Sequence, residues 1–157
     1  TDQFTPLIPG HQEFGLRGGT ENVVGIVAIG ESCRYIKYNQ KDIKSQITEL
    51  HNYLEQQLSI IKNLTINCKG VERIPNTTSI TFDNFAGNQM MFKLENAGIC
   101  VSTGSACNSE SSEPSYVLTS MGIKNPQNTI RISIDENTTK SQIDYFINHL
   151  KNILEGE

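Results

Sequence analysis

The chain has 157 residues, and 13 Lys and Arg against 17 Asp and Glu give it a formal net charge of −4 at pH 7. This mild acidity, without a cluster of basic residues, argues against nucleic acid or an anionic membrane as a partner. No apolar run approaches the roughly 20 residues needed to span a bilayer, and the length suffices for one hydrophobic core.

The first part of the chain predicts an irregular segment followed by two helices. Pro and Gly punctuate residues 1–19, whereas residues 21–38 carry small apolar side chains in a helical pattern. A second helix is expected over residues 42–61, where apolar residues recur every three or four positions and so share one face. We expect that face to point to the core; it holds Ile43, Ile47, Leu50, Leu54, Leu58 and Ile61.

Four short strands are predicted farther along the chain. They cover residues 64–66, 78–82, 99–102 and 129–134, each rich in β-branched residues. The last one alternates strictly, so Ile130, Ile132 and Ile134 share one face while Arg131 and Ser133 lie on the other.

Three more helices are expected between and after these strands. They cover residues 88–96, residues 115–121 after Pro114, and a C-terminal segment that begins with the capping-box pattern Thr139-x-x-Gln142. The buried face of the last helix is predicted to hold Ile143, Phe146, Ile147, Leu150 and Leu154. The mixture of helices and strands predicts an α+β fold, with helices packed on a small mixed or antiparallel sheet.

The four cysteines are Cys33, Cys68, Cys100 and Cys107. The chain has no CxxC motif, and none of its three histidines has a ligand spacing to a cysteine, so we expect no metal site. Reduced thiols are the better interpretation, and at least three of them are expected to be inert, buried packing residues.

The turn from Arg17 to Asn22 is the first candidate site. Its two glycines allow the backbone to approach a ligand closely, and the Thr20 hydroxyl with free N–H groups at a helix start suits an anion such as phosphate. The alternative is a flexible turn in which Thr20 is only the N-cap of the following helix.

The second candidate is Cys107, which lies in a run of small polar residues from Ser102 to Glu113. An exposed thiol on a loop suits a nucleophile that must move toward its substrate, and we expect this loop to be the most mobile part of the chain. Two nearby glutamates do not favour the thiolate, so activation requires a proton relay or a cationic partner. The residues alone leave an unreactive thiol open as the alternative.

Arg131 is the third candidate. A rigid strand that holds a planar, two-pronged donor suits the binding of a carboxylate. The alternative is a surface arginine in a weak ion pair.

Four segments carry a resemblance to a known family. They are RGGTENVVGI from Arg17, ITFDN from Ile80, STGSACNSESSEPSYVL from Ser102 and IRISIDENTT from Ile130. Together they resemble the C-terminal part of a cysteine desulfurase of the NifS/IscS type, a member of the class V aminotransferases. The STGSAC segment is the specific one, since it resembles the SSGSAC loop of this type rather than the shorter loop of the SufS type.

This resemblance implies a homodimeric, cytoplasmic enzyme of fold type I that depends on pyridoxal 5′-phosphate. Such an enzyme converts L-cysteine to L-alanine and passes the sulfur to an acceptor such as an iron–sulfur scaffold or a tRNA thiolase. It further implies that Cys107 carries the persulfide, that Arg131 holds the substrate α-carboxylate, and that Thr20 reaches the cofactor phosphate across the dimer interface. Residues 1–20 correspond to the linker from the cofactor domain with its phosphate-binding turn, and residues 21–157 to the small C-terminal domain.

The sequence also departs from the family. The Schiff-base lysine lies upstream of the matched region, and no lysine occurs before Lys37, so we expect the chain alone to be inactive. Asp135 and Glu136 stand where Gly-Arg is more common, and Asn108 follows Cys107 where Ser or Thr is common. A non-enzymatic sulfur-relay or partner-binding domain, and a related lyase or aminotransferase in which Cys107 is incidental, remain as alternatives.

Overall fold

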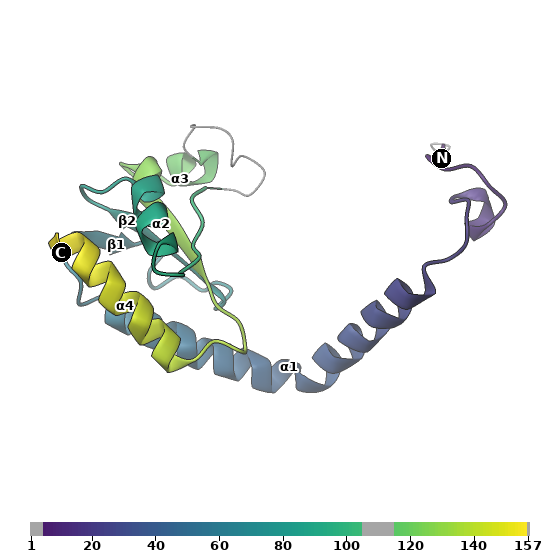
Figure 1. The fold of residues 1–157 in the computed structure, drawn as a ribbon, viewed down its shortest axis with the longest axis horizontal. Coiled ribbons are helices and arrows are strands. Elements are labelled where there is room, and N and C mark those ends of the chain that lie inside the picture. Colours follow the sequence, from purple (N-terminus) through teal and green to yellow (C-terminus); the bar gives the residue numbers. More distant parts are fainter. Residues whose placement is uncertain (1–4, 105–114, 157) are drawn as a thin grey trace. The chain divides into compact units, whose positions relative to one another are not determined.

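The computed structural model describes residues 5–104 and 115–156 of the chain (Figure 1). It divides into two compact units, Thr1–Gln40 and Lys41–Glu157. The first unit contains the short 3-10 helix η1 (Glu13–Gly15) and the beginning of helix α1 (Val23–Leu58); the second contains the end of α1 and all other elements.

Helix α1 is a single helix of 36 residues, where the sequence pattern predicted two. The prediction was wrong because nothing between the two patterns ends a helix: residues 39–42 are Asn-Gln-Lys-Asp, without Gly or Pro. The side-chain amide of Asn39 donates to the carbonyl oxygen of Tyr35 at 2.8 Å, one turn earlier in the same helix. Only the C-terminal part of α1 has buried side chains, namely those of Leu50, His51, Leu54 and Leu58.

The sheet lies in the second unit and has three strands in the order β1 (Leu64–Ile66), β2 (Thr77–Phe82) and β3 (Thr129–Ser133). Both pairings are antiparallel, with Ile80 of β2 opposite Ile66 on one side and Ile130 on the other. The predicted sheet is therefore confirmed in its antiparallel form.

The strand predicted over residues 99–102 is not formed. Only Ser102 pairs with β3, through an isolated bridge to Arg131. The N–H of Ile99 instead donates to the carbonyl oxygen of Leu94, at the end of helix α2 (Gly87–Glu95), at 3.0 Å. Because this segment is tied to the helix end at its start, it reaches the sheet edge only at Ser102.

One hydrophobic core fills the second unit, where α2 packs against β3 and against helix α4 (Lys140–Glu155). Its buried members are Leu50, Leu54, Leu58, Ile66, Ile80, Phe82, Met90, Leu94, Ile130, Ile132, Ile134, Ile143, Phe146, Ile147 and Leu150. This list contains the predicted buried face of the last strand and most of that of the last helix, Leu154 being partly buried. The α+β fold class is confirmed.

The ends of α4 and the remaining short helices follow local signals. The predicted capping box is present: Thr139 Oγ1 accepts from the N–H of Gln142 at 3.3 Å, and the N–H of Thr139 donates to Gln142 Oε1 at 2.9 Å. Helix α3 (Tyr116–Ser120) and the 3-10 helix η3 (Pro126–Asn128) lie between residue 115 and β3. In the described ranges, no helix is both long and apolar enough to cross a membrane.

Candidate functional site

Arg131 lies in the middle of β3, where its backbone joins two neighbouring segments. It stands opposite Ser79 of β2. On its other side, the N–H of Arg131 donates to the carbonyl oxygen of Ser102 at 2.7 Å, and the N–H of Ser102 donates back at 3.1 Å. The side chain lies on the face opposite the buried isoleucines, as predicted, and remains partly exposed.

The guanidinium of Arg131 turns toward the same segment. Its Nη1 donates to the carbonyl oxygen of Gly104 at 3.2 Å. A guanidinium has five N–H donors in a planar fork, so this single bond leaves donors for a two-pronged contact with a carboxylate. The alternative of a surface ion pair has no support within the described ranges, where no carboxylate pairs with Arg131.

The turn from Arg17 to Asn22 is built by close contacts inside the first unit. Gly18 is buried, and its N–H donates to the carbonyl oxygen of Ile8 at 2.8 Å. A Cβ on Gly18 would lie only 2.3 Å from the carbonyl oxygen of Pro9. This glycine therefore permits two chain segments to pack closely, whereas we had expected both glycines to serve the approach of a ligand.

Gly19 and Arg17 give the turn its shape. Gly19 has a φ of 103°, which other residues rarely adopt. The Nη1 of Arg17 donates to the carbonyl oxygens of Gly19 and Thr20, at 3.1 Å each. These bonds orient the backbone that leads into α1.

Asn22, not Thr20, caps helix α1. The Oδ1 of Asn22 accepts a hydrogen bond from the N–H of Gly25 at 3.1 Å, so the alternative role of Thr20 as N-cap was wrong. Thr20 is exposed, and its hydroxyl makes no hydrogen bond to any residue that the structure describes. The Thr20 hydroxyl precedes the N-cap residue of α1 by two positions. A hydroxyl near a helix N-terminus can donate a hydrogen bond to an oxygen of a phosphate group.

Cys107 and the surrounding residues 105–114 lie outside the described residues. The prediction that this loop is the most mobile part of the chain concerns the same residues and stays a prediction. The other three cysteines, Cys33, Cys68 and Cys100, are free and exposed, so the expectation of at least three buried thiols was wrong. None of them occupies a core position: Cys33 is in the first unit, Cys68 has a φ of 55° in the turn after β1, and Cys100 is in the unpaired segment before Ser102. No group of three potential metal ligands occurs in the described part of the chain.

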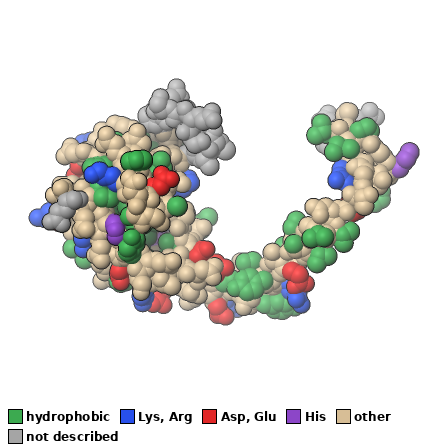
Figure 2. All heavy atoms as spheres, viewed as in Figure 1, with side chains coloured by type: hydrophobic (Ala, Val, Ile, Leu, Met, Phe, Trp, Pro, Cys, Tyr) green, Lys and Arg blue, Asp and Glu red, His purple; other side chains and the backbone are tan. Residues whose placement is uncertain are grey.

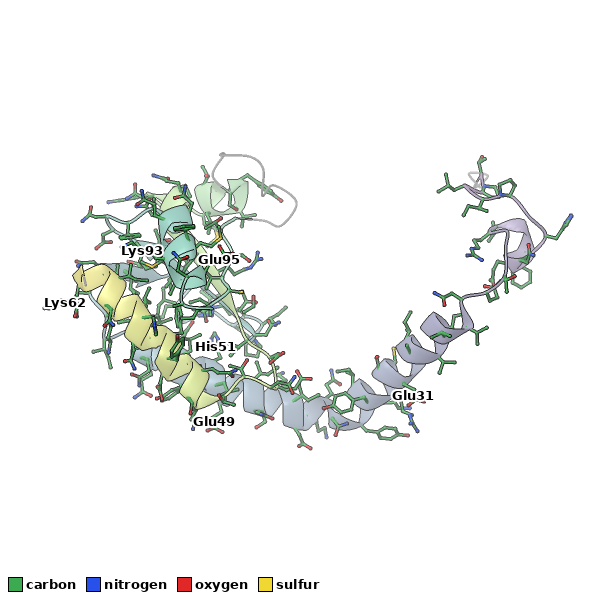
Figure 3. All side chains as sticks on the ribbon, viewed as in Figure 1. Glu31, Glu49, His51, Lys62, Lys93 and Glu95 are labelled. Carbon is green, nitrogen blue, oxygen red and sulfur yellow. The ribbon has the colours of Figure 1, made fainter. Side chains whose placement is uncertain are left out.

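Sequence reasoning missed a polar cluster around His51, which projects from α1 (Figure 3). Its Nδ1 lies 3.3 Å from Thr78 Oγ1, and its Nε2 lies 3.4 Å from Glu55 Oε1 and 3.3 Å from Arg73 Nη1. Arg73 also pairs with Glu55. Burial lowers the pKa of His51, Arg73 adds to this effect, and Glu55 opposes it.

The signal for this cluster was the position of His51 within the apolar stripe, four residues after Ile47 and three before Leu54. The contacts tie the segment between β1 and β2 to α1. The cluster is therefore part of the framework of the second unit.

Comparisons with known proteins all point to the same protein family. The family described as aminotransferase class-V matches residues 10–146. The chain is 40% identical over 157 residues to cysteine desulfurase 2 of Trichormus variabilis, and 42% identical over 159 residues to a cysteine desulfurase of Trichormus azollae. In each case the match covers 98% of this chain and 39% of the relative, so the chain spans about two fifths of the length of these curated relatives.

A solved structure has a similar fold. The X-ray structure of a NifS-like protein from Rickettsia africae superposes with a TM-score of 0.83 at 33% sequence identity. The match covers 98% of this chain and 41% of that one. The described fold is thus that of a segment of NifS-like proteins.

Proposed function

Because the chain belongs to the aminotransferase class-V family, we propose that it is the C-terminal part of a cysteine desulfurase of the NifS/IscS type. The complete enzyme removes sulfur from L-cysteine, releases L-alanine and leaves a persulfide on Cys107. Residues 1–20 are the linker with the phosphate-binding turn, and residues 21–157 are the small domain. The relatives named cysteine desulfurase support this proposal across 98% of the chain.

The observation that carries the proposal is the position of Arg131 beside Gly104, three residues before Cys107. A carboxylate bound to the free donors of Arg131 lies close to the start of the segment that carries the thiol. Because the backbone of Arg131 is paired with Ser79 on one side and with Ser102 on the other, binding through this arginine orients the substrate as well as holding it.

The sulfur step needs a thiolate and no external oxidant. The Cys107 sulfur forms a bond to the sulfur of L-cysteine, and the bond between that sulfur and the substrate Cβ breaks with its electron pair left on carbon. Protonation of that carbon gives L-alanine, so the carbon is reduced while the sulfur becomes part of the persulfide. When bound, pyridoxal 5′-phosphate supplies the electron sink for the amino-acid carbon.

The chain's own part in holding the cofactor is confined to the phosphate. The Thr20 hydroxyl and the N-terminus of α1 fit that group, and we place them across the interface of a homodimer. The lysine that holds the cofactor belongs to the part of the protein that precedes the matched region in the family, so the 157-residue chain alone is inactive. The persulfide passes in the cytoplasm to an acceptor protein such as an iron–sulfur scaffold or a tRNA thiolase.

The test uses the complete protein that contains this chain. Its visible spectrum is recorded, L-cysteine is added, and added sulfur is located by peptide mass spectrometry. We expect a cofactor chromophore, alanine formation and a persulfide on Cys107. The Cys107→Ser variant loses the persulfide and alanine formation, whereas Cys100→Ser, which removes another exposed thiol, keeps both.

Three results contradict the proposal. A protein without the chromophore, or one whose added sulfur sits on another cysteine, is a relay or binding protein. Alanine formation that survives Cys107→Ser assigns the protein to a related lyase in which this cysteine is incidental.

A further inference from the structure

The sheet face that carries Arg131 also carries polar side chains that the proposed function does not use. Arg131 stands directly opposite Ser79. Two positions away on the same strands, Thr129 stands opposite Thr81. Because side chains alternate along a strand, these four residues share one face of the sheet, and the buried isoleucines of β2 and β3 lie on the other.

Asn67, which follows β1, joins these side chains into one network. Its backbone N–H donates to the carbonyl oxygen of Ser79 at 2.9 Å. Its side-chain Nδ2 donates to Ser79 Oγ and to Thr81 Oγ1, at 2.9 Å each, and its Oδ1 accepts from Thr81 Oγ1 at 3.2 Å. The Oγ1 atoms of Thr81 and Thr129 are 2.7 Å apart. Since Asn67 and both threonines are buried, this polar network holds the Asn67 amide in one orientation.

Ser79 links the polar network to Arg131. It lies on the central strand, so Asn67 beside β1 and Arg131 on β3 flank it on opposite sides. The backbone N–H and C=O of Arg131 both bond to Ser102, so Arg131 and Ser79 form a pair without mutual backbone hydrogen bonds, with Cα atoms about 4.5 Å apart and side chains close together. Among the described residues, Ser79 Oγ bonds only to Asn67. The hydroxyl is thus drawn toward β1 and away from Arg131.

We propose that Asn67 is a positioning residue for the binding of the substrate carboxylate, and that it acts through Ser79. A side chain rotates among staggered positions, and a serine hydroxyl accepts hydrogen bonds as well as donating them. Released from Asn67, the Ser79 hydroxyl turns toward Arg131 and accepts a hydrogen bond from the guanidinium. That bond takes up a donor that the carboxylate needs and draws the guanidinium away from Gly104. The proposal rests on the proposed function, because the carboxylate is that of L-cysteine.

Stability alone does not account for the polar network. Replacing both partners of a buried hydrogen bond by apolar groups of the same shape is nearly neutral or even stabilising. Apolar side chains at Asn67, Thr81 and Thr129 would therefore join the three strands as well. The amide is required only if the hydroxyl that it holds has to be kept in place.

The direction of a single guanidinium matters because the surroundings offer a carboxylate little else. On the face of the second unit that Figure 2 shows, basic side chains lie scattered among acidic and apolar ones. Among the described residues on that face, no broad basic patch attracts an anion. Two-pronged recognition of a carboxylate also needs two donors of one guanidinium in a fixed direction.

Three variants of the complete protein separate positioning from folding. Asn67→Leu removes the amide, and we expect KM for L-cysteine to rise about 5- to 10-fold at unchanged kcat, because one hydrogen bond to the carboxylate is lost. Ser79→Ala keeps the KM of the parent protein. The double variant Asn67→Leu/Ser79→Ala returns KM to the parent value, because no hydroxyl is left to compete. Its free energy of unfolding stays lowered, which urea unfolding measures.

Thr78→Val is the matched control. Thr78 is buried on the opposite face of the same strand, so this variant loses a buried hydroxyl without touching the polar network, and its KM stays at the parent value. If Asn67→Leu does not fold, Asn67→Ala makes the same comparison with a smaller side chain.

A second measurement does not depend on turnover. Phenylglyoxal modifies accessible arginine side chains, and peptide mass spectrometry gives the rate at Arg131. L-Alanine slows this modification because its carboxylate occupies the guanidinium. We expect the concentration of L-alanine for half-maximal protection to rise in Asn67→Leu by the same factor as KM, and to return to the parent value in the double variant.

The proposal is overturned if Asn67→Leu changes neither KM nor the protection by L-alanine. It is also overturned if Ser79→Ala does not restore them, since Asn67 then contributes to folding alone. The outcomes for the proposed function are separate. A protein that forms no alanine, but whose Arg131 protection responds to these variants as expected, contradicts only the function. Alanine formation with unresponsive protection contradicts only the role of Asn67.

Discussion

The guanidinium of Arg131 donates a hydrogen bond to the carbonyl oxygen of Gly104 at 3.2 Å, while the backbone of Arg131 is paired with Ser102. One strand residue therefore holds both ends of the short segment from Ser102 to Gly104. Cys107 follows three residues later. In the enzyme that we propose, the guanidinium of Arg131 contacts both the substrate carboxylate and the backbone at Gly104. This arrangement makes Arg131 the most informative residue to change.

Replacing Arg131 tests its role in binding the substrate carboxylate. In the complete protein we expect Arg131→Gln to lower kcat/KM for L-cysteine by about 10- to 100-fold, mainly through KM, because charge-assisted hydrogen bonds contribute about 1.5–3 kcal/mol. Steady-state kinetics of alanine formation measures this. Lys62→Gln, which removes an exposed cation, is the control, and an equal loss in both variants rules out the assigned role.

The Thr20 hydroxyl is expected to bind the cofactor phosphate. Thr20→Val keeps the shape of the side chain but removes a hydrogen bond to a charged group, so the dissociation constant of pyridoxal 5′-phosphate rises by about 10- to 100-fold. Titration of the apoprotein, followed by the visible spectrum, measures the change. Thr65→Val, at another exposed threonine, should bind as the unmodified protein does; a Thr20→Val variant with unchanged affinity speaks against the phosphate site.

Phe82 and Phe92 form a matched pair for testing the core. Phe82 is fully buried, whereas Phe92 is 64% exposed. Phe82→Ala leaves a cavity and lowers the free energy of unfolding by about 3–5 kcal/mol, whereas Phe92→Ala changes it by about 0.5 kcal/mol or less. Urea unfolding followed by circular dichroism compares the two variants. Similar losses in the free energy of unfolding contradict the assignment of Phe82 to the core.

The His51 cluster makes stability depend on pH. Burial holds the pKa of His51 below its usual value of 6.5, so the unfolded chain binds a proton at a higher pH than the folded chain does. The free energy of unfolding therefore decreases as the pH falls below about 6.5 and levels off below the folded-state pKa. In His51→Gln this part of the pH dependence disappears.

Urea unfolding between pH 7.5 and 5 measures that dependence. His11→Gln controls for the loss of one histidine, because His11 is exposed in the first unit. A His51→Gln variant that keeps the full slope shows that other groups cause it.

Features encoded by neighbouring residues were predictable. The capping box needs only Thr139 and Gln142, and the burial of Ile130, Ile132 and Ile134 follows from the alternation of a strand. The same holds for the Leu50, Leu54 and Leu58 stripe. Such signals depend on helix or strand geometry over a few residues, which does not change with the surroundings.

Two of the errors arose where local signals competed, and a third came from reliance on an average. Thr20 and Asn22 are both good N-caps, and only the start of α1 at Val23 decides between them. Residues 99–102 have the composition of a strand, but the bond from Ile99 to the end of α2 holds all but Ser102 off the sheet. We expected buried cysteines because free cysteines are buried in most proteins. That average does not predict the exposure of a particular cysteine, and the three described ones are exposed.

The sequence by itself determined the α+β class, the core faces and the candidate residues Thr20, Cys107 and Arg131, because periodicity and residue chemistry are written in the order of the chain. Tertiary structure alone decided that Arg131 contacts Gly104 and that Arg73 and Glu55 meet at His51. It also showed that the side chains of Val23, Val24, Ile26, Val27 and Ile29 are exposed in the described chain. These relationships join segments that are far apart in sequence or depend on what surrounds a helix, and only packing in three dimensions specifies them.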